Sequence, residues 1–216
     1  MHIKVFVCNP FQENTYLVWD DEKNALLIDP GFYDASEFSR AEKWTRENGL
    51  VVRRALNTHL HLDHCIGNGF VKETFDVDAE AGTADLFLVQ NAERQAQMFG
   101  LDISMRIPLT EKFLKDGDMV ACGEIRLNVL EVPGHSPGGL AFYDAENALL
   151  FAGDTLFRNS YGRTDLPGGD EEALFRSIRE KLFRLPENTR VFSGHGPTTT
   201  IAEEIAFWKS QGLFSD

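Results

Sequence analysis

The segment from residue 58 to residue 67, THLHLDHCIG, concentrates side chains that commonly bind metal ions. Three of the six histidines of the chain lie here with one aspartate, as His59, His61, Asp63 and His64. An extended strand would turn His64 away from the other three. A helix would stack His59 on Asp63 and leave His61 on another face. A turn at a strand end can gather all four. A polar surface loop would explain one histidine, whereas three imidazoles and a carboxylate predict a metal site.

Further candidate ligands follow predicted strands downstream, each beside a glycine: His135 in VPGH, Asp154 in AGD and His195 in SGHG. Small residues at these points let the backbone turn tightly and approach an ion. His2 lacks this context and is expected on the surface. Seven ligands are too many for one tetrahedral zinc and suit two metal ions that share a carboxylate. A hydroxide held between two such ions has a lowered pKa, so no protein nucleophile is required.

The elements that must position these side chains follow from the apolar patterns and the turn residues. Predicted strands cover 3–7, 14–19, 24–29, 51–58, 119–122 and 125–132, a hairpin spans 139–154, and a short strand begins at 190. Predicted helices cover 36–48, 66–75, 84–99, 171–183 and 199–210. In the first helix Ser36 is the expected N-cap and Gly49 the expected stop.

An internal echo indicates that the chain contains two similar halves. The tetrapeptide NALL occurs at 24–27 and at 147–150, each time after an apolar strand and an acidic turn and before an aspartate near a glycine. A chance match is the alternative. Two halves that mix strands and helices predict an α+β fold, with two mixed sheets packed face to face and helices outside. The 216 residues favour one domain over 1–216.

Composition narrows the class of protein. The formal net charge of −13 disfavours a nucleic-acid partner, because an acidic surface repels phosphates. No apolar run reaches the length of a membrane span, and the start of the chain has no pattern of a secretory or transit peptide, so a cytoplasmic protein without membrane contact is expected. Three scattered cysteines argue against a disulfide framework and fit a reducing compartment.

The ordered ligand set resembles that of the metallo-β-lactamase superfamily, and the resemblance covers nearly the whole chain. It implies an αββα sandwich of two similar halves. It further implies that one metal ion is bound by His59, His61 and His135. The second ion would be bound by Asp63, His64 and His195, with Asp154 bridging the two. In this family the residue matching Asp63 also orients the attacking hydroxide or takes its proton. Zinc is the expected metal, although iron and manganese accept the same ligands.

The stretch GDTLFRNSYGRTDLPGGD, residues 153–170, resembles the glyoxalase II group of thioester hydrolases. The resemblance implies that Arg163 contacts the glutathione moiety. The family has an aromatic hydroxyl two residues on, where this chain has Asp165. An arginine paired with Asp165 or Asp170 is the alternative for Arg163. From the same loop, three further residues are weaker candidates for substrate contact: Arg158, Ser160 and Tyr161.

Related groups leave alternatives open. GRTD is also found in persulfide dioxygenases, which hold one iron, whereas GHGPTTT at 194–200 is similar to short bacterial hydrolases of the glyoxalase II type. Common zinc β-lactamases place a cysteine near the position of Asp154, so antibiotic hydrolysis is not expected. Asp29 is predicted to orient a ligand histidine, with a turn-forming role before Pro30 as the alternative. About 20 residues follow His195, so no separate C-terminal glutathione-binding domain is expected.

The function predicted from the sequence is a binuclear metal-dependent hydrolase of a small thioester such as S-lactoylglutathione. Its substrate would be an anionic thioester or another thiol-derived small molecule. The alternatives are a mononuclear iron persulfide dioxygenase and a lactonase or other ester hydrolase of the same fold. A non-catalytic binding module is disfavoured because the ligand set is intact. The chain is expected to be a monomer or a homodimer.

Overall fold

The computed structural model describes residues 1–103 and 105–213, and the strands of these residues form two six-stranded sheets. The first sheet has the order β1-β2-β3-β4-β5-β6 and contains β1 (His2–Cys8), β2 (Glu13–Trp19), β3 (Asn24–Ile28), β4 (Val51–Leu56), β5 (Ala79–Ala81) and β6 (Lys112–Phe113). The second has the order β14-β13-β10-β9-β8-β7 and contains β7 (Met119–Cys122), β8 (Ile125–Glu131), β9 (Leu140–Asp144), β10 (Leu149–Gly153), β13 (Arg190–Ser193) and β14 (Thr199–Thr200). A small hairpin pairs β11 (Leu156–Phe157) with β12 (Ser160–Tyr161).

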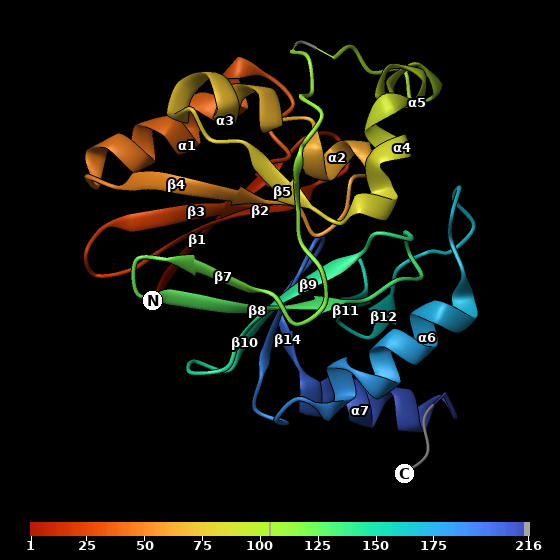
Figure 1. The fold of residues 1–216 in the computed structure, drawn as a ribbon. Helices are drawn as coiled ribbons and strands as arrows, with labels where there is room; N and C mark the ends of the chain where they lie inside the picture. Colours follow the sequence, from red (N-terminus) through yellow and green to blue (C-terminus); the bar gives the residue numbers. More distant parts are fainter. Residues whose placement is uncertain (104, 214–216) are drawn as a thin grey trace.

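Helices cover the outer face of each sheet (Figure 1). The first sheet carries α1 (Ala35–Glu47), α2 (Leu62–Cys65), α3 (Asn68–Phe75), the 3-10 turn η1 (Thr83–Asp85), α4 (Leu86–Gln90) and α5 (Ala92–Met98). The second carries α6 (Glu171–Glu180), η2 (Leu182–Arg184) and α7 (Ile201–Ser210). The predicted sandwich, with helices outside two mixed sheets, is confirmed. Within the described residues no helix has the length and apolar character needed to cross a membrane.

The central strands are buried on both faces, which explains their nearly continuous apolar runs. In β3, Leu26 and Ile28 point into the core between the sheets, where they join Phe142 and Phe151 of the second sheet. Successive side chains alternate, so Leu27 points outward and packs beneath α1 and α3. The sandwich is therefore held by three apolar layers, one between the sheets, one under α1 and α3 and one under α6 and α7, and a fourth apolar cluster packs α2, α4 and α5 together.

The repeated tetrapeptide belongs to two similar hairpins, one in each sheet. The β2–β3 turn is held by Asp20, which accepts a hydrogen bond from the backbone N–H of Asn24 at 2.8 Å. In the β9–β10 turn, Asp144 accepts from the backbone N–H of Asn147 at 3.0 Å. Both hairpins lie inside their sheets and run towards the same end of the sandwich. The strand after each turn ends next to an aspartate, Asp29 or Asp154.

Two helix details differ from the sequence prediction. The helix α1 begins at Ala35 because Asp34, rather than Ser36, is its N-cap, with its carboxylate accepting from the backbone N–H groups of Ser36 and Glu37. A carboxylate at Asp34, two residues before Ser36, can reach both free N–H groups of the first turn, which is the role of an N-cap. The helix predicted over 84–99 is divided at Asn91 into α4 and α5.

Candidate metal centre

The segment after β4 leaves the sheet without regular structure and then forms one helical turn. His61 is the N-cap of α2 in an extended conformation, and Asp63 and His64 lie within that four-residue helix. The side-chain amide of Asn57 donates to the carbonyl of His64 at 2.7 Å, and that of Asn9 donates to the carbonyl of Asp63 at 2.9 Å. These two amides hold the turn, so all four candidate ligands lie at the same end of the sheet.

The remaining candidates arrive from loops at the same end of the second sheet. His135 follows β8, Asp154 directly follows β10, and His195 follows β13. The residue before His195 must be a glycine, Gly194, because atoms of other residues approach it closely. A Cβ atom at Gly194 would lie 2.2 Å from Asp154 Oδ1 and 2.6 Å from His64 Cε1. The glycine-rich signature around His195 therefore has a steric cause in the structure.

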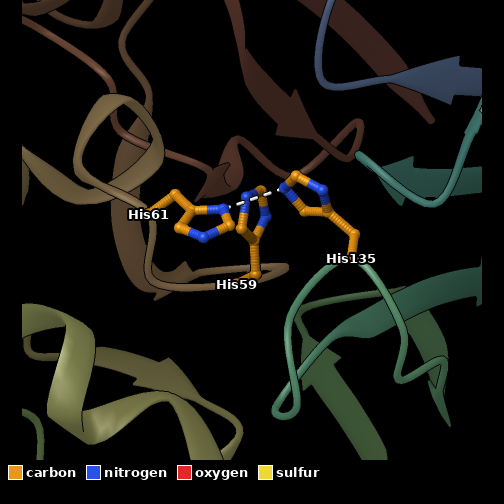
Figure 2. A group of neighbouring side chains, drawn as sticks. All are labelled: His59, His61 and His135. Atoms are coloured by element: carbon orange, nitrogen blue, oxygen red, sulfur yellow. Dashed lines mark hydrogen bonds between the residues drawn. The ribbon is translucent and has the colours of Figure 1, made fainter. Parts of the chain in front are cut away.

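Three imidazoles form the first cluster, and Figure 2 shows that they come from two separate loops. The ligand atoms of His59, His61 and His135 all lie within 4.8 Å of one another, and all three residues are buried. His61 Nδ1 lies 2.8 Å from His135 Nε2. Two ring nitrogens so close must share either a proton or a cation.

The second cluster combines Asp63, His64 and His195, whose ligand atoms also lie within 4.8 Å of one another. Asp63 Oδ2 is 3.2 Å from His195 Nε2 and 3.7 Å from His64 Nε2. This group mixes one carboxylate with two imidazoles, whereas the first group has imidazoles alone. Both are donor sets that zinc and iron accept.

The carboxylate of Asp154 lies between the two clusters. Its Oδ1 is 3.4 Å from His64 Nε2, and its Oδ2 is 3.6 Å from His135 Nε2 and 3.5 Å from His195 Nε2. Burial opposes its charge, but the surrounding imidazoles of His64, His195 and His135 outweigh this effect and lower its pKa. An ionised carboxylate between two histidine groups has the geometry of a shared ligand.

In three of the histidines the outer ring nitrogen is held by an acceptor, which leaves the inner one available to an ion. Nδ1 of His64 lies 3.0 Å from Asp29 Oδ2, Nδ1 of His135 lies 2.7 Å from the Arg163 carbonyl, and Nδ1 of His195 lies 3.1 Å from the Phe11 carbonyl. Carbonyl and carboxylate oxygens accept, so the proton belongs on Nδ1 and the lone pair on Nε2. Metal-binding histidines are usually oriented in this way.

Buried atoms without partners provide the test of whether a cation fits. Within the described residues, four buried atoms of the two clusters have no hydrogen-bond partner: His59 Nε2, His61 Nε2, His64 Nε2 and Asp154 Oδ1. A buried polar atom left unpaired is costly, and coordinated ions would satisfy those of His59, His64 and Asp154. His61 would instead bind through Nδ1, the nitrogen that faces His135 Nε2. Burial and the neighbouring imidazoles lower the pKa of His59, and they lower that of His61 to about 4. These rings are therefore neutral near pH 7, the state that binds metals.

Two buried aspartates hold the ligand loops in place. Asp29 accepts from the backbone N–H and the hydroxyl of Thr58, both at 2.6 Å, in addition to its contact with His64. Asp85 accepts from the backbone N–H of Leu60 at 3.2 Å, the Ser136 hydroxyl at 2.8 Å and the backbone N–H of Gly138 at 2.6 Å. Asp85 thus ties the first ligand loop to the His135 loop.

The sequence predicts that Asp29 orients a ligand histidine, but it gives no indication of the role of Asp85. An acidic residue in the first turn of a predicted helix ordinarily indicates an exposed position. Asp85 is instead fully buried, and burial raises its pKa despite its three hydrogen bonds. No local pattern marks it, because its partners lie 25, 51 and 53 residues away along the chain.

A pocket of about 630 Å³ adjoins the clusters and is lined by Phe11, His61, Leu62, Asp63, Phe87, Leu88, Asn91, Arg94, Gln95, Met98, Phe99, His135, Asp154, Arg163, Leu166, Pro167 and His195. Its floor contains side chains of both clusters, and its wall is largely apolar. This volume is within the range of roughly 300–1,000 Å³ typical of small-molecule sites. The arrangement can therefore present a substrate directly to the candidate ligands.

The substrate-binding candidates of the 158–163 loop have different surroundings. Arg163 lines the pocket, and its guanidinium donates to both carboxylate oxygens of Asp165 at 2.6 and 2.7 Å. The lining found among the described residues does not include Arg158, Ser160 or Tyr161. The Tyr161 ring instead packs against Phe175 and Trp208 in the core beneath the second sheet.

Comparisons with known proteins agree with this geometry. A family model described as the metallo-beta-lactamase superfamily matches residues 8–195. The chain is 38% identical to the hydroxyacylglutathione hydrolase GloC of Haemophilus influenzae, over 94% of this chain and 95% of that one. Among solved structures, it is 34% identical to the BLEG-1 B3 metallo-beta-lactamase, with a TM-score of 0.86 over 95% and 97% of the two chains. It is 42% identical to TTHA1623 in a di-iron-bound form, with a TM-score of 0.83 over 94% and 96%.

Proposed function

The chain belongs to the metallo-beta-lactamase superfamily as a metallo-hydrolase, and we propose that it hydrolyses small thioesters by means of two metal ions. The observation that carries this proposal is the pocket, whose floor exposes side chains of both candidate clusters and the shared Asp154. Likeness to a hydroxyacylglutathione hydrolase over nearly the whole chain supports a thioester substrate such as S-lactoylglutathione.

In this proposal His59, His61 and His135 would hold one ion, Asp63, His64 and His195 would hold the other, and Asp154 would be a ligand shared by the two. The unpartnered nitrogens and the neutral imidazoles of the first cluster support the assignment. Two bound ions would supply Lewis acidity for the substrate carbonyl and a water molecule of lowered pKa. Zinc is the proposed metal. The di-iron form of TTHA1623 supports iron as the second candidate.

Residues of the chain would orient the reactants. Asp63 lines the pocket with its side chain 17% exposed, and its Oδ2 contacts His195 Nε2 at 3.2 Å. It is thereby fixed where it can accept a hydrogen bond from the attacking water and take its proton. Cys65 is no competing nucleophile, since it is fully buried and burial raises the pKa of its thiol. The apolar wall beside the floor would exclude bulk water from the reacting groups.

The test is hydrolysis of S-lactoylglutathione by zinc-loaded and iron-loaded protein, with metal content measured on the same samples. We expect thiol release that is abolished in a chelated sample and in Asp154→Asn. Absence of hydrolysis above the chelated control would disprove the thioester proposal for this substrate. Asp144→Asn serves as a matched control, because Asp144 is a buried aspartate in the β9–β10 turn.

A second candidate, hydrolysis of a β-lactam, is favoured by the likeness to BLEG-1 at 34% identity. This chain has Asp154 near the position where common zinc β-lactamases have a cysteine. Only lactamases whose metal ligands are all histidine and aspartate are therefore relevant models. Nitrocefin added to the same panel distinguishes the two reactions. Oxygen consumption with glutathione persulfide tests the dioxygenase alternative, for which about one iron per chain would also be expected.

A further inference from the structure

The pocket wall formed by α4 and α5 has one face that lines the pocket and one face that is buried. Five of the six residues of this segment that line the pocket recur at helical spacing, namely Phe87, Asn91, Arg94, Gln95 and Met98, and the sixth, Leu88, also packs into the buried cluster. The opposite face packs Val89, Ala92 and Ala96 into one apolar cluster with Leu60, Leu62 and Cys65. The wall therefore rests directly on the segment that carries the first four candidate ligands. The face that lines the pocket therefore has a fixed position relative to the candidate metal centre.

Large apolar side chains are exposed at the end of this wall and in the adjacent loop between β1 and β2, which carries Phe11. Phe11 is 37% exposed, Phe99 is 52% exposed and Met98 is 75% exposed, and the rings of Phe11 and Phe99 meet edge to face at 5.2 Å. Large apolar side chains gathered on a concave surface commonly mark a binding site, because a ligand can remove them from water. The occupant of the pocket should therefore carry an apolar segment.

Arg94 is the cation of this wall that has no acidic partner. The residues three and four positions away on the helix are Gln90, Asn91, Gln97 and Met98, none of which is acidic. Among the described residues no carboxylate lies within ion-pair distance of its guanidinium, although the chain has a net charge of −13. Arg163 is different, because the adjacent Asp165 carboxylate binds its guanidinium through two hydrogen bonds and cancels its charge.

We propose that Arg94 is the anion receptor of the substrate pocket, so that the preferred substrate is an amphipathic thioester with an apolar segment between its reacting carbonyl and a terminal carboxylate. The position of the carbonyl rests on the proposed function, whereas the anion and the apolar segment rest on the wall itself. An arginine free of protein partners can bind a carboxylate through two parallel hydrogen bonds. Recognition of charge is thereby assigned to α5 and not to the loop that carries Arg163.

Two acetyl thioesters of equal shape provide the kinetic test, one of 4-(mercaptomethyl)benzoate and one of 4-(mercaptomethyl)benzamide. For Arg94→Gln we expect the KM of the benzoate to rise about 10-fold with little change in kcat, since a charge-assisted hydrogen bond is lost. The KM of the neutral amide should change less than about 2-fold. Arg94→Lys should restore part of the benzoate preference. Arg46→Gln, at an exposed arginine of α1 outside the pocket lining, is the matched control and should change both KM values by less than about 2-fold. Arg163→Gln tests the competing assignment and should lower the benzoate preference less than Arg94→Gln does.

Equal effects of Arg94→Gln on both esters, or a larger effect of Arg163→Gln, would overturn the assignment. Binding is measured independently by calorimetry with two thioethers that cannot be hydrolysed, 4-(methylthiomethyl)benzoate and its amide. The wild-type protein should prefer the benzoate, and Arg94→Gln should abolish that preference. If the benzoate preference persists in Arg94→Gln, the carboxylate is bound elsewhere, for example by the metal centre, and the proposal is refuted. If the wild-type protein shows no benzoate preference, the proposal is refuted as well.

The two assays separate this inference from the proposed function. If metal-loaded protein hydrolyses neither thioester but the calorimetric preference depends on Arg94, the thioesterase proposal fails and the anion receptor stands. If both esters are hydrolysed without dependence on Arg94, the thioesterase proposal stands and the anion receptor fails. Metal content and melting temperature of each variant should match the wild type, because Arg94 is exposed and lies on the face of α5 away from the core.

Discussion

The metal centre and the α4–α5 wall border the same pocket but are built in opposite ways. His59, His61, His64 and His135 are each at most 7% exposed, and they lie in short loops after strands or in the first turn of a helix. In the wall, Met98 and Phe99 are more than half exposed. Buried side chains that are joined by hydrogen bonds are held in one geometry, whereas exposed side chains can be substituted with little effect on the fold. Changes in the centre should therefore alter metal binding, and changes in the wall should alter substrate preference alone.

The largest effect should come from Asp154→Asn. The amide cannot carry the charge that faces three histidines, so the occupancy of both ions should fall, and activity should drop by more than about 100-fold. His195→Ala should mainly lower the occupancy of one ion. Metal content by mass spectrometry after gel filtration is the measurement. Full occupancy of both ions in Asp154→Asn would show that this carboxylate does not bridge them.

Asp29→Asn should have the next largest effect, because Asp29 holds the His64 ring and Thr58 together. An asparagine can place a donor where the hydroxyl or ring N–H now donates, which disturbs the orientation of His64. We expect metal affinity to fall about 10–100-fold, as is typical when a group that orients a ligand is changed. Competition with a chelating dye gives the affinity. Asp144→Asn, a buried aspartate in the other hairpin, should leave the affinity unchanged, and equal effects would mean a general loss of stability.

Asp85→Asn should weaken the centre selectively, because Asp85 joins the loop of His59 and His61 to the loop of His135. The affinity for the ion in this cluster should fall about 10-fold. Loss of the charged acceptor should lower the free energy of unfolding by about 1–3 kcal/mol. Sequential zinc titration separates the two ions, and urea denaturation measures stability. An equal loss at both ions would contradict the specific role of Asp85.

The smallest effect should come from Phe99→Ala in the wall. Removing a half-exposed ring takes away apolar contact with the substrate worth about 1 kcal/mol, which corresponds to about a 5-fold rise in KM. Metal content should stay at the wild-type level, and the melting temperature should change little. A comparable substitution on the buried side, Val89→Ala, should instead lower stability. Loss of metal in Phe99→Ala would contradict the expectation that substitutions in the wall leave metal binding unchanged.

Much of the centre could be predicted from sequence, because its ligands are marked by residue type and local spacing. Imidazoles and carboxylates beside glycines at strand ends indicate the seven side chains that the structure brings together, from His59 to His195. The hairpin echo likewise indicates the two sheets. These signals are short in range, since a strand end and a tight turn depend on a few neighbouring residues.

The surroundings of Asp85, Arg94 and Arg163 were decided by the tertiary structure. Asp85 acquires its role from three partners on distant segments, and Arg94 from the packing of α5 on the α2 segment. The loop motif directs attention to Arg163 and Tyr161, but one side chain is paired with Asp165 and the other lies against Trp208. Residue types and spacing along the chain thus determined which side chains can bind metal. The packing of distant segments decided which side chains orient them and which charge remains free in the pocket.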